Sequence, residues 1–391
     1  MRFRGFTDNW ALTPIKKLLK FQNGINADSN KYGKGVKYIS VSDILNNQYI
    51  TYDCIKGLID IDEKTFNKFI VEYGDILFQR SSETFEDIGR ANVYLDKEHP
   101  ATFGGFVIRG KKISDYDPLF FRYLLCTYNA RKQTIRMGAG AQHYNIGQEG
   151  LERISLYFPS IIEQEKISLF LNLLDDKIEV QNKIIEDLKV LKKELCNRHF
   201  KVIYNNTSLE YVTLKNILTE RKEYCGKDGT YIHGTLSKEG VSPKTERYDR
   251  DFLVKSEDKQ YKVTHFNDIC YNPANLKFGV ICRNTFGDLI FSPIYITFEI
   301  SKEVYPAYIE LFLTNANFLG RIRRYEQGTV YERMAVSPED FLSYETRMPS
   351  YEEQVKFADE IQHIQEKIEL EISFLYSLQK QRKYLLNVMF I

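Results

Sequence analysis

The sequence predicts an α+β protein with an internal duplication, in which two globular α/β domains with mixed sheets are each followed by a long helix. One motif occurs twice, as Pro159–Ser–Ile–Ile–Glu–Gln–Glu–Lys166 and as Pro349–Ser–Tyr–Glu–Glu–Gln–Val–Lys356. At the offset of 190 that relates the copies, seven of the twenty positions from 159 to 178 are identical, where chance would give about one. A long heptad-patterned segment follows each copy.

The duplication extends upstream, because Asp75–Phe78 resembles Asp268–Tyr271 and Asp117–Phe120 resembles Tyr305–Tyr308. Each copy is expected to contain a short N-terminal helix, four apolar strands and a domain helix, then a final strand that ends at the motif proline. In the first copy these are the helix Pro14–Phe21, the strands Tyr38–Ser42, Ile70–Phe78, Ala91–Leu95 and Phe103–Arg109, and the helix Pro118–Arg136. In the second copy they are the helix Val212–Glu220, the strands Tyr231–Leu236, Phe266–Tyr271, Val280–Arg283 and Leu289–Ile300, and the helix Pro306–Arg324.

The long helices are expected at about 160–200 and 350–391, where apolar residues recur in steps of four and three. Polar residues interrupt both patterns at matching places, Gln181 with Glu371 and Lys192 with Arg382. Two similar patterns favour antiparallel pairing of the helices about a pseudo-two-fold axis; alternatively, each is a core helix of its own domain. The expected helix seam consists of Ile167, Leu171, Leu174, Ile178, Ile185, Leu188, Leu195, Phe357, Ile361, Ile364, Ile368, Leu375, Leu378 and Leu385.

These patterns divide the chain into domain 1 at 1–158, a central helix at 159–204, domain 2 at 205–348 and a C-terminal helix at 349–391. The net charge is only +1, so any binding of nucleic acid must come from local basic patches. The six cysteines form no C-x-x-C pair, and neither a signal peptide nor an apolar run long enough to span a membrane is present. The expected location is therefore the cytoplasm, with no membrane partner.

The repeated motif, the two long helices and the matched strand motifs resemble the specificity subunit of type I restriction–modification systems, which act in phage defence. The strand motifs are Gly74–Phe78 and Asn267–Tyr271, and the loops around Gly138–Ile146 and Gly328–Val336 also match. The resemblance covers nearly the whole chain. It implies two target-recognition domains that each bind half of a bipartite, asymmetric target in double-stranded DNA, separated by coiled-coil spacer helices.

The same resemblance implies that the chemistry belongs to partner subunits. Two methyltransferase subunits that use S-adenosylmethionine would dock on the helices, and restriction subunits that use ATP and Mg would join them. No cofactor, metal or catalytic residue is expected in this chain. Asn272–Pro–Ala–Asn275 lacks the second proline and the aromatic residue of a methyltransferase motif. Gly138–His143 lacks a third glycine, and no phosphate-binding loop is present.

Candidate DNA-binding residues lie on equivalent loops of the two copies, where cations can contact phosphates and amides or guanidinium groups can contact bases. The loop after the Asp-Ile strand contributes Gln79, Arg80, Ser81, Ser82, Asn272, Asn275 and Lys277. The end of the domain helix and its following loop contribute Arg131, Arg136, Gln142, His143, Arg321, Arg323, Arg324, Tyr331 and Arg333. A further set, expected mainly at phosphates, is Lys34, Lys37, Lys238, Lys244 and Arg247. Arg90, after Gly89, is expected either to reach a groove or to cap the end of a strand.

Each set also has a simpler interpretation. Polar residues of a hairpin turn can face water only, and cations at a helix C-terminus are favoured by the helix dipole. Two other functions stay open at this stage. One is a scaffold whose coiled coil joins two protein-binding domains, and the other is a catalytic methyltransferase or restriction polypeptide, against which the missing cofactor motifs argue.

Overall fold

The computed structural model describes residues 2–140, 143–226, 231–238, 240–244, 260–327 and 335–390. The chain forms two compact units. Unit 1 comprises Met1–Asn182 and Ser373–Ile391, and unit 2 comprises Lys183–Ile372. The long helices α6 (Ile161–Asn205) and α11 (Tyr351–Met389) each contribute one part to each unit.

Unit 1 is built on a four-stranded antiparallel sheet in the order β2-β9-β5-β7 and a three-stranded mixed sheet in the order β4-β3-β8. Two further pairs, β1-β11 and β6-β10, complete it. Its strands are β1 (Ala11–Pro14), β2 (Leu19–Asn23), β3 (Tyr32–Ile39), β4 (Leu58–Ile59), β5 (Ile76–Gln79), β6 (Ser81–Ser82), β7 (Ala91–Val93), β8 (Thr102–Phe103), β9 (Val107–Lys112), β10 (Tyr144–Asn145) and β11 (Ser155–Phe158).

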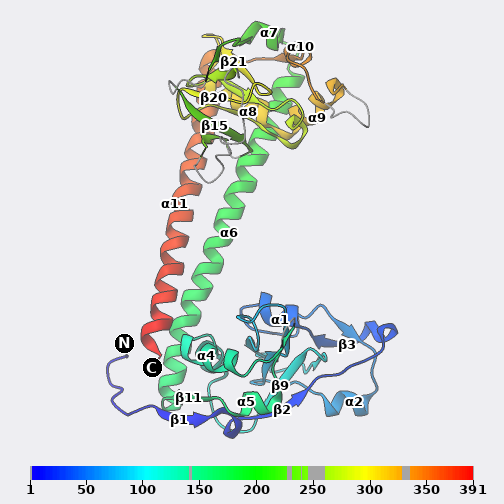
Figure 1. Cartoon of the computed structure of the whole chain (residues 1–391), viewed down its shortest axis with the longest axis vertical. Coiled ribbons are helices and arrows are strands. Elements are labelled where there is room, and N and C mark those ends of the chain that lie inside the picture. Colours follow the sequence, from blue (N-terminus) through cyan, green and yellow to red (C-terminus); the bar gives the residue numbers. More distant parts are fainter. Residues whose placement is uncertain are drawn as a thin grey trace. The chain divides into compact units, whose positions relative to one another are not determined.

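The helices of unit 1 are short, apart from its share of α6 and α11 (Figure 1). They are η1 (Ile15–Lys17), η2 (Ser29–Lys31), α1 (Val41–Asn46), α2 (Glu63–Lys68), α3 (Pro118–Leu125), α4 (Tyr128–Arg136) and α5 (Gln148–Glu152). The core lies between the four-stranded sheet, α3 and the ends of the long helices, since Phe78 and Phe120 share one buried cluster with Leu171 of α6 and Leu385 of α11.

Unit 2 repeats this plan. Its four-stranded sheet has the order β13-β21-β18-β19, and a five-stranded mixed sheet has the order β14-β17-β20-β15-β16. The strands are β12 (Tyr211–Thr213), β13 (Leu218–Glu220), β14 (Tyr224–Cys225), β15 (Ile232–Ser237), β16 (Gly240–Pro243), β17 (Tyr261–Thr264), β18 (Ile269–Tyr271), β19 (Ile281–Arg283), β20 (Leu289–Phe291), β21 (Ile296–Ile300) and β22 (Glu345–Arg347). The short helices are α7 (Leu214–Ile217), η5 (Leu276–Phe278), α8 (Pro306–Thr314), α9 (Ala316–Ile322), η6 (Arg323–Tyr325) and α10 (Pro338–Leu342).

The four-stranded sheets correspond strand for strand, and the mixed sheets, which have three and five strands, share a parallel pair. This confirms the predicted duplication and the α+β class with mixed sheets. The parallel pair β3-β8 of unit 1 corresponds to the parallel pair β15-β20 of unit 2, and the antiparallel pair β1-β11 corresponds to β12-β22. Some details of the prediction are wrong. The expected strands Phe103–Arg109 and Leu289–Ile300 are each two strands, β8 with β9 and β20 with β21, separated by a turn. The N-terminal helices are only single turns between strands, η1 and α7, because the apolar residues around them alternate into sheets.

The predicted domain helices are each two helices joined at a sharp break. In unit 1 the break falls at Cys126 and Thr127, where the Thr127 hydroxyl accepts a hydrogen bond from the backbone N–H of Ala130 and so caps α4. In unit 2 it falls at Asn315, whose side chain caps α9. Polar residues of this kind start a new helix because they bond to its free N–H groups.

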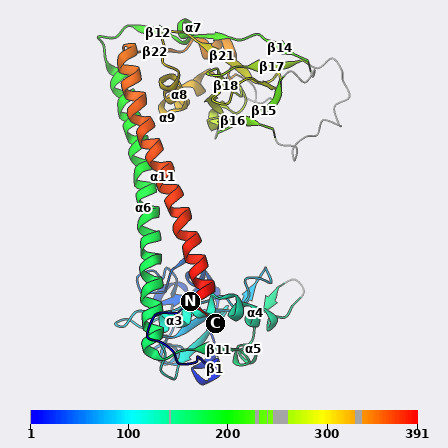
Figure 2. The ribbon, with the colours of Figure 1, turned by 90° about the vertical axis from the view of Figure 1, so that its left-hand side faces the viewer.

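The long helices run antiparallel within each unit, as predicted. In unit 1, Asp175 of α6 pairs with Arg382 of α11, and in unit 2, Lys192 of α6 bonds to Gln365 of α11. Further along α6, Lys177 lies over the Phe374 ring in unit 1, and His199 stacks on Phe357 in unit 2. Within each unit, residue numbers thus rise along one helix while they fall along the other, and both views draw the two helices of each unit side by side (Figures 1 and 2). The helix ends also belong to the domain cores, as the alternative interpretation required.

The predicted helix seam is buried or half-buried along its length, with one exception. Leu195 is exposed, and the next residue, Cys196, is buried in its place. A heptad step of seven residues from Leu188 leads to Leu195, but a straight α-helix drifts by about 20° in every heptad. The contact position therefore moves forward by one residue near this end of α6.

The repeated Pro-Ser-x-x-Glu-Gln motif fastens the start of each long helix to its domain. The Gln164 side chain accepts a hydrogen bond from the backbone N–H of Asp117 (3.0 Å) and donates one to the carbonyl of Pro159 (2.9 Å). Gln354 makes the same two bonds, to Tyr305 (2.9 Å) and Pro349 (3.0 Å). The glutamine thus bridges the first turn of the long helix and the residue that precedes α3 or α8.

The glutamate of the motif differs between the copies. Glu353 accepts hydrogen bonds from the backbone N–H and hydroxyl of Ser350, which caps α11. Glu163 instead pairs with Arg2 through two hydrogen bonds of 2.8 and 2.6 Å. The N-terminal segment of unit 1 is thereby held to α6.

Candidate nucleic-acid interface

The strand motif that the two copies share builds a turn. Gly74 (φ 91°) and Asn267 (φ 73°) stand at equivalent positions in the left-handed region, which glycine and asparagine tolerate best. The following aspartates, Asp75 and Asp268, are buried and accept backbone hydrogen bonds from Glu72 and His265, which also correspond. The motif therefore positions the strand and the loop after it, and its aspartates face inward.

In unit 1 the loop after β5 meets the loop after α4, so two of the predicted sets are brought together. Strand β6 pairs with β10, and the Ser81 hydroxyl donates to the Asn145 side chain (2.5 Å). The backbone N–H of Ile146 donates to the carbonyl of Arg80 (3.0 Å). Arg80 is half-buried, and its guanidinium also lies near the Gly105 carbonyl (3.4 Å).

Not every member of this loop faces outward. Gln79 is buried and donates to the Ser81 carbonyl (2.9 Å), and Ser82 is buried at the β6-β10 pair. Within the part of the chain that the structure describes, the side-chain carbonyl of Gln79 has no hydrogen-bond partner. Gln79 and Ser82 thus shape the loop, whereas Arg80 and Ser81 lie nearer its surface.

The same junction recurs in unit 2. The backbone N–H of Val336 donates to the carbonyl of Pro273 (3.3 Å), as Ile146 does to Arg80 in unit 1, and the Tyr271 hydroxyl donates to the Val336 carbonyl (3.1 Å). Asn272 is buried and caps the turn through the N–H of Ala274. The other two candidates of this loop differ from Asn272: Asn275 is exposed, and Lys277 lies over the Phe278 ring.

The basic residues at the end of the domain helix have different roles in unit 1. Arg131 is turned inward, where it donates to the carbonyls of Glu86 (2.8 Å) and Ile88 (2.7 Å), and burial lowers the pKa of its guanidinium. It therefore holds the 84–90 loop against α4. Arg136 and His143 are exposed, while Gln142 lies outside the described residues.

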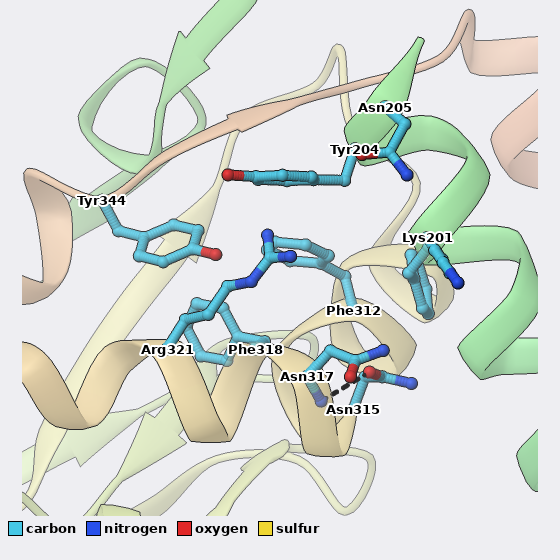
Figure 3. Close-up of a pocket in the computed structure, with 10 residues that line it drawn as sticks. Lys201, Tyr204, Asn205, Phe312, Asn315, Asn317, Phe318, Arg321 and Tyr344 are labelled. Atoms are coloured by element: carbon cyan, nitrogen blue, oxygen red, sulfur yellow. Dashed lines mark hydrogen bonds between the residues drawn. The ribbon is translucent and has the colours of Figure 1, made fainter.

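In unit 2, Arg321 has a structural environment. Its guanidinium lies 3.6 Å from the centre of the Tyr204 ring and beside the Tyr344 hydroxyl, in a cavity of about 380 Å³ between the end of α6, α8 and α9 (Figure 3). Stacking on an aromatic face is a common use of arginine. Arg323 and Arg324 are exposed, and Tyr331 and Arg333 lie outside the described residues.

The third set and Arg90 are mostly exposed. Lys34 is paired with Asp60 (3.1 Å) and Arg90 with Asp87 (2.7 Å), both on the surface. Lys37 donates to the Tyr52 carbonyl (2.8 Å) and is the least available member. Lys238 and Lys244 are exposed, and Arg247 lies outside the described residues.

Partner docking was expected on the long helices without named residues, and the outer face of α6 carries a row of exposed aliphatic side chains. In unit 1, Ile162, Leu169, Leu173 and Val180 are all exposed, and in unit 2 so are Ile184, Leu191, Leu195 and Val202. Each set has the spacing 7, 4 and 7, so an 11-residue repeat keeps its members on one face of the helix. We call these eight residues the outer stripe. The seven-residue repeat of the helix seam runs through the same segment of sequence as the 11-residue repeat of the outer stripe. The seam pattern therefore hides the outer stripe in the sequence.

A model of the type I restriction modification DNA specificity domain matches residues 8–190. Residues 8–190 therefore belong to this family. Nearly the whole chain resembles a protein of Methanocaldococcus jannaschii that is described as a type I restriction enzyme MjaX specificity subunit. The two are 22% identical, over 98% of this chain and 93% of that protein.

Solved structures share the fold of this chain. A specificity subunit from M. genitalium has a TM-score of 0.54 at 15% identity, with 100% of this chain and 97% of that chain covered. The HsdS subunit from Thermoanaerobacter tengcongensis has a TM-score of 0.52 at 11% identity, with 97% and 96% covered. Among the described residues, no helix is long and apolar enough to cross a membrane, and no group of acidic, histidine and cysteine side chains could hold a metal ion.

Proposed function

We propose that this chain is the DNA sequence-specificity subunit of a type I restriction–modification complex, and that each domain recognises one half of a bipartite, asymmetric target. One observation carries the proposal. The same junction of two loops occurs in both units, at Arg80 with Ile146 and at Pro273 with Val336, but different side chains surround it. Because the backbone junction is the same in both domains but the loop side chains differ, the two domains suit two different half-sites better than two identical ones.

Within each half-site, we assign base contacts to the loop after the Asp-Ile strand and phosphate contacts to the exposed cations around it. Arg80 and Ser81 are the base-contacting candidates in domain 1, and Asn275 is the candidate in domain 2, because guanidinium and amide groups can bond to base edges in the major groove. Arg136, Lys238, Lys244, Arg323 and Arg324 are exposed and suit phosphates.

The long helices set the gap between half-sites in this proposal. Two domains that meet equivalent grooves on one face of a duplex must bind about one helical turn, ~10 bp, apart. The chain itself carries out no catalysis. Two methyltransferase subunits that use S-adenosylmethionine, and restriction subunits that use ATP and Mg, would supply the chemistry.

The outer stripe supports docking of the methyltransferase subunits on α6. Four exposed aliphatic side chains in each unit are costly to leave in water and offer a ready contact for an apolar partner surface. The presence of one set in each unit fits two docked subunits. Polar cytosolic surfaces seldom keep so regular a row of large aliphatic residues without a partner.

A co-expression experiment tests both parts. The chain is purified with its methyltransferase subunits, and methylation of adenine in genomic DNA is mapped by sequencing. Arg80→Ala is expected to relax one half-site only, with a loss of about 1–3 kcal/mol in discrimination at the affected base pair. Unchanged half-sites would refute the assignment of Arg80.

Docking is tested with neighbouring residues of α6. Leu191→Glu places a charge on the outer stripe, whereas Val190→Glu places one on an equally exposed position about 100° around the helix. The first variant is expected to co-purify with less methyltransferase and the second to behave as the unchanged chain. Equal recovery for both variants would remove the outer stripe as the docking surface.

A further inference from the structure

Both units present one large apolar side chain at the tip of an equivalent turn. Phe106, between β8 and β9, is 69% exposed, and Ile294, between β20 and β21, is 61% exposed. The turns correspond because β9 pairs with β5 as β21 pairs with β18. The two side chains share little besides their size and their apolar character.

The Phe106 turn is rigid. The N–H of Val107 donates to the carbonyl of Gly104 (2.9 Å). From the adjacent segment, the N–H of Gly24 donates to the carbonyl of Val107 (3.1 Å), and the N–H of Ile25 donates to the carbonyl of Phe103 (3.0 Å). A Cβ atom at Gly105 would overlap the present position of the Asn26 side chain. The backbone is therefore fixed while the phenyl ring points into solvent.

The turn adjoins the loop that we assign to base contacts. The N–H of Arg80 donates to the carbonyl of Phe106 (2.8 Å), and the Arg80 guanidinium lies near the carbonyl of Gly105. In unit 2, Ile296 pairs in register with Tyr271, which immediately precedes Asn272. In each copy the exposed apolar residue thus lies beside the first residues of the loop after the Asp-Ile strand.

A single exposed apolar residue usually needs no explanation. Here, however, two copies whose loops have diverged both have an exposed apolar residue at the equivalent position, Phe106 and Ile294. In unit 1 the turn is held by backbone hydrogen bonds and lies next to the Arg80 guanidinium. A rigid apolar side chain contributes contact area at a small entropic cost. Beside a hydrogen-bonding group, this arrangement fits a base pair that has both polar edges and an apolar methyl group.

We infer that Phe106 and Ile294 contact bases directly, each against the C5 methyl group of a thymine in the major groove of its half-site. The inference rests on the proposed function. Methylation of adenine requires an A·T pair, so a methylated half-site contains such a methyl group. Large apolar side chains such as Phe106 and Ile294 suit this methyl group, because apolar contact with the thymine methyl is an established means of sequence discrimination.

Binding of duplex DNA by the complex with methyltransferase subunits tests the inference, once methylation mapping has given the target. Phe106→Ala is expected to weaken binding of the target about five- to tenfold, from the loss of apolar contact. Binding of unrelated duplex should not change. Ile294→Ala should do the same through the other half-site. Tyr128→Ala, which removes an aromatic residue that is 70% exposed on α4, is the matched control and should have no effect.

Replacement of thymine by deoxyuridine removes only the methyl group. At one thymine of the domain 1 half-site, this replacement should weaken DNA binding by the unchanged complex severalfold. It should not further weaken DNA binding by the complex that carries Phe106→Ala. If Phe106→Ala binds as the unchanged chain does, or if both effects simply multiply at every thymine, the inference is wrong. If the unchanged complex bound the target and unrelated duplex equally well, the proposed function would be refuted instead.

Discussion

Arg382 of α11 and Asp175 of α6 form an ion pair at the helix seam of unit 1, and the Tyr123 hydroxyl of α3 donates to the same carboxylate (2.9 Å). The corresponding contact in unit 2 joins Lys192 to the neutral side chain of Gln365 (2.8 Å). The duplicated helices therefore keep a polar bridge at matched positions but give it different chemistry. Polar residues in a seam cost stability and fix register.

Loss of the bridge is expected to cost more in unit 1. Arg382→Ala leaves the buried Asp175 carboxylate without its main partner and should lower the free energy of unfolding by roughly 2–3 kcal/mol, since Arg382 is itself partly exposed. Lys192→Ala leaves a neutral amide and should cost about 1 kcal/mol. Urea unfolding measures both, and equal losses would contradict this account of the two bridges.

The motif glutamines should be needed for stability. Gln164→Leu keeps the volume of the side chain but leaves the Asp117 N–H and the Pro159 carbonyl without partners, at a cost of about 2–3 kcal/mol. Gln354→Leu should cost a similar amount in unit 2. Thermal unfolding and limited proteolysis would detect the change. Glu165→Ala, at an exposed position one residue further on, is the control and should be neutral.

Unit 2 should lose stability in mild acid through His199. Burial lowers the pKa of His199 to about 4, where its ring stacks on Phe357 and bonds to the Tyr308 hydroxyl. The unfolded chain binds a proton first as the pH falls, at about 6.5. Stability is therefore full above pH 6.5 and declines between pH 6.5 and 4, by about 2 kcal/mol once partial exposure of the ring is allowed for.

Urea unfolding at several pH values checks this decline, which His199→Phe should largely abolish. His265 provides a contrast, because burial lowers its pKa but its bonds to Asp288 and Glu223 raise the pKa above the ordinary value overall. Its contribution is present at low pH and is lost as the pH rises through its pKa in the folded chain. A decline in acid that survives His199→Phe would assign the effect to another group.

Two arginines of α4 should differ in what they affect. Arg136→Ala removes an exposed cation and should lower the slope of log K against log salt for DNA binding by about one, without a change of preferred sequence. Arg131→Ala should leave that slope unchanged and destabilise unit 1 instead, because its guanidinium bonds to two carbonyls of the 84–90 loop. The opposite pattern would reverse the two assignments.

Much of the fold could be predicted from the sequence because the two copies support each other. The matched motif at 159–166 and 349–356 located both long helices, and every seam residue predicted from heptad spacing is buried or half-buried except Leu195. The breaks at Thr127 and Asn315 were not predicted, since each lies within a run whose apolar residues suit one continuous helix. Only the hydrogen bond of the capping side chain reveals a new helix start there.

The candidate interface was harder to predict because residue type does not give direction. Arg80 and Gln79 are adjacent in the sequence, yet Gln79 is buried and Arg80 lies nearer the surface. Arg131 and Arg321 looked like phosphate contacts by composition, and both turned out to hold structural partners. The outer stripe was visible as an 11-residue spacing, but exposure was needed to separate it from the seam.

The most direct test of the central claim is a genome-wide map of methylated adenines in the source cell, with and without this gene. We expect a motif that depends on the gene and consists of two different half-sites separated by a fixed gap of unspecified bases. Arg80→Ala should relax one of these half-sites. A contiguous or palindromic motif, or a methylation pattern that does not change when the gene is lost, would contradict recognition of two half-sites by two unlike domains.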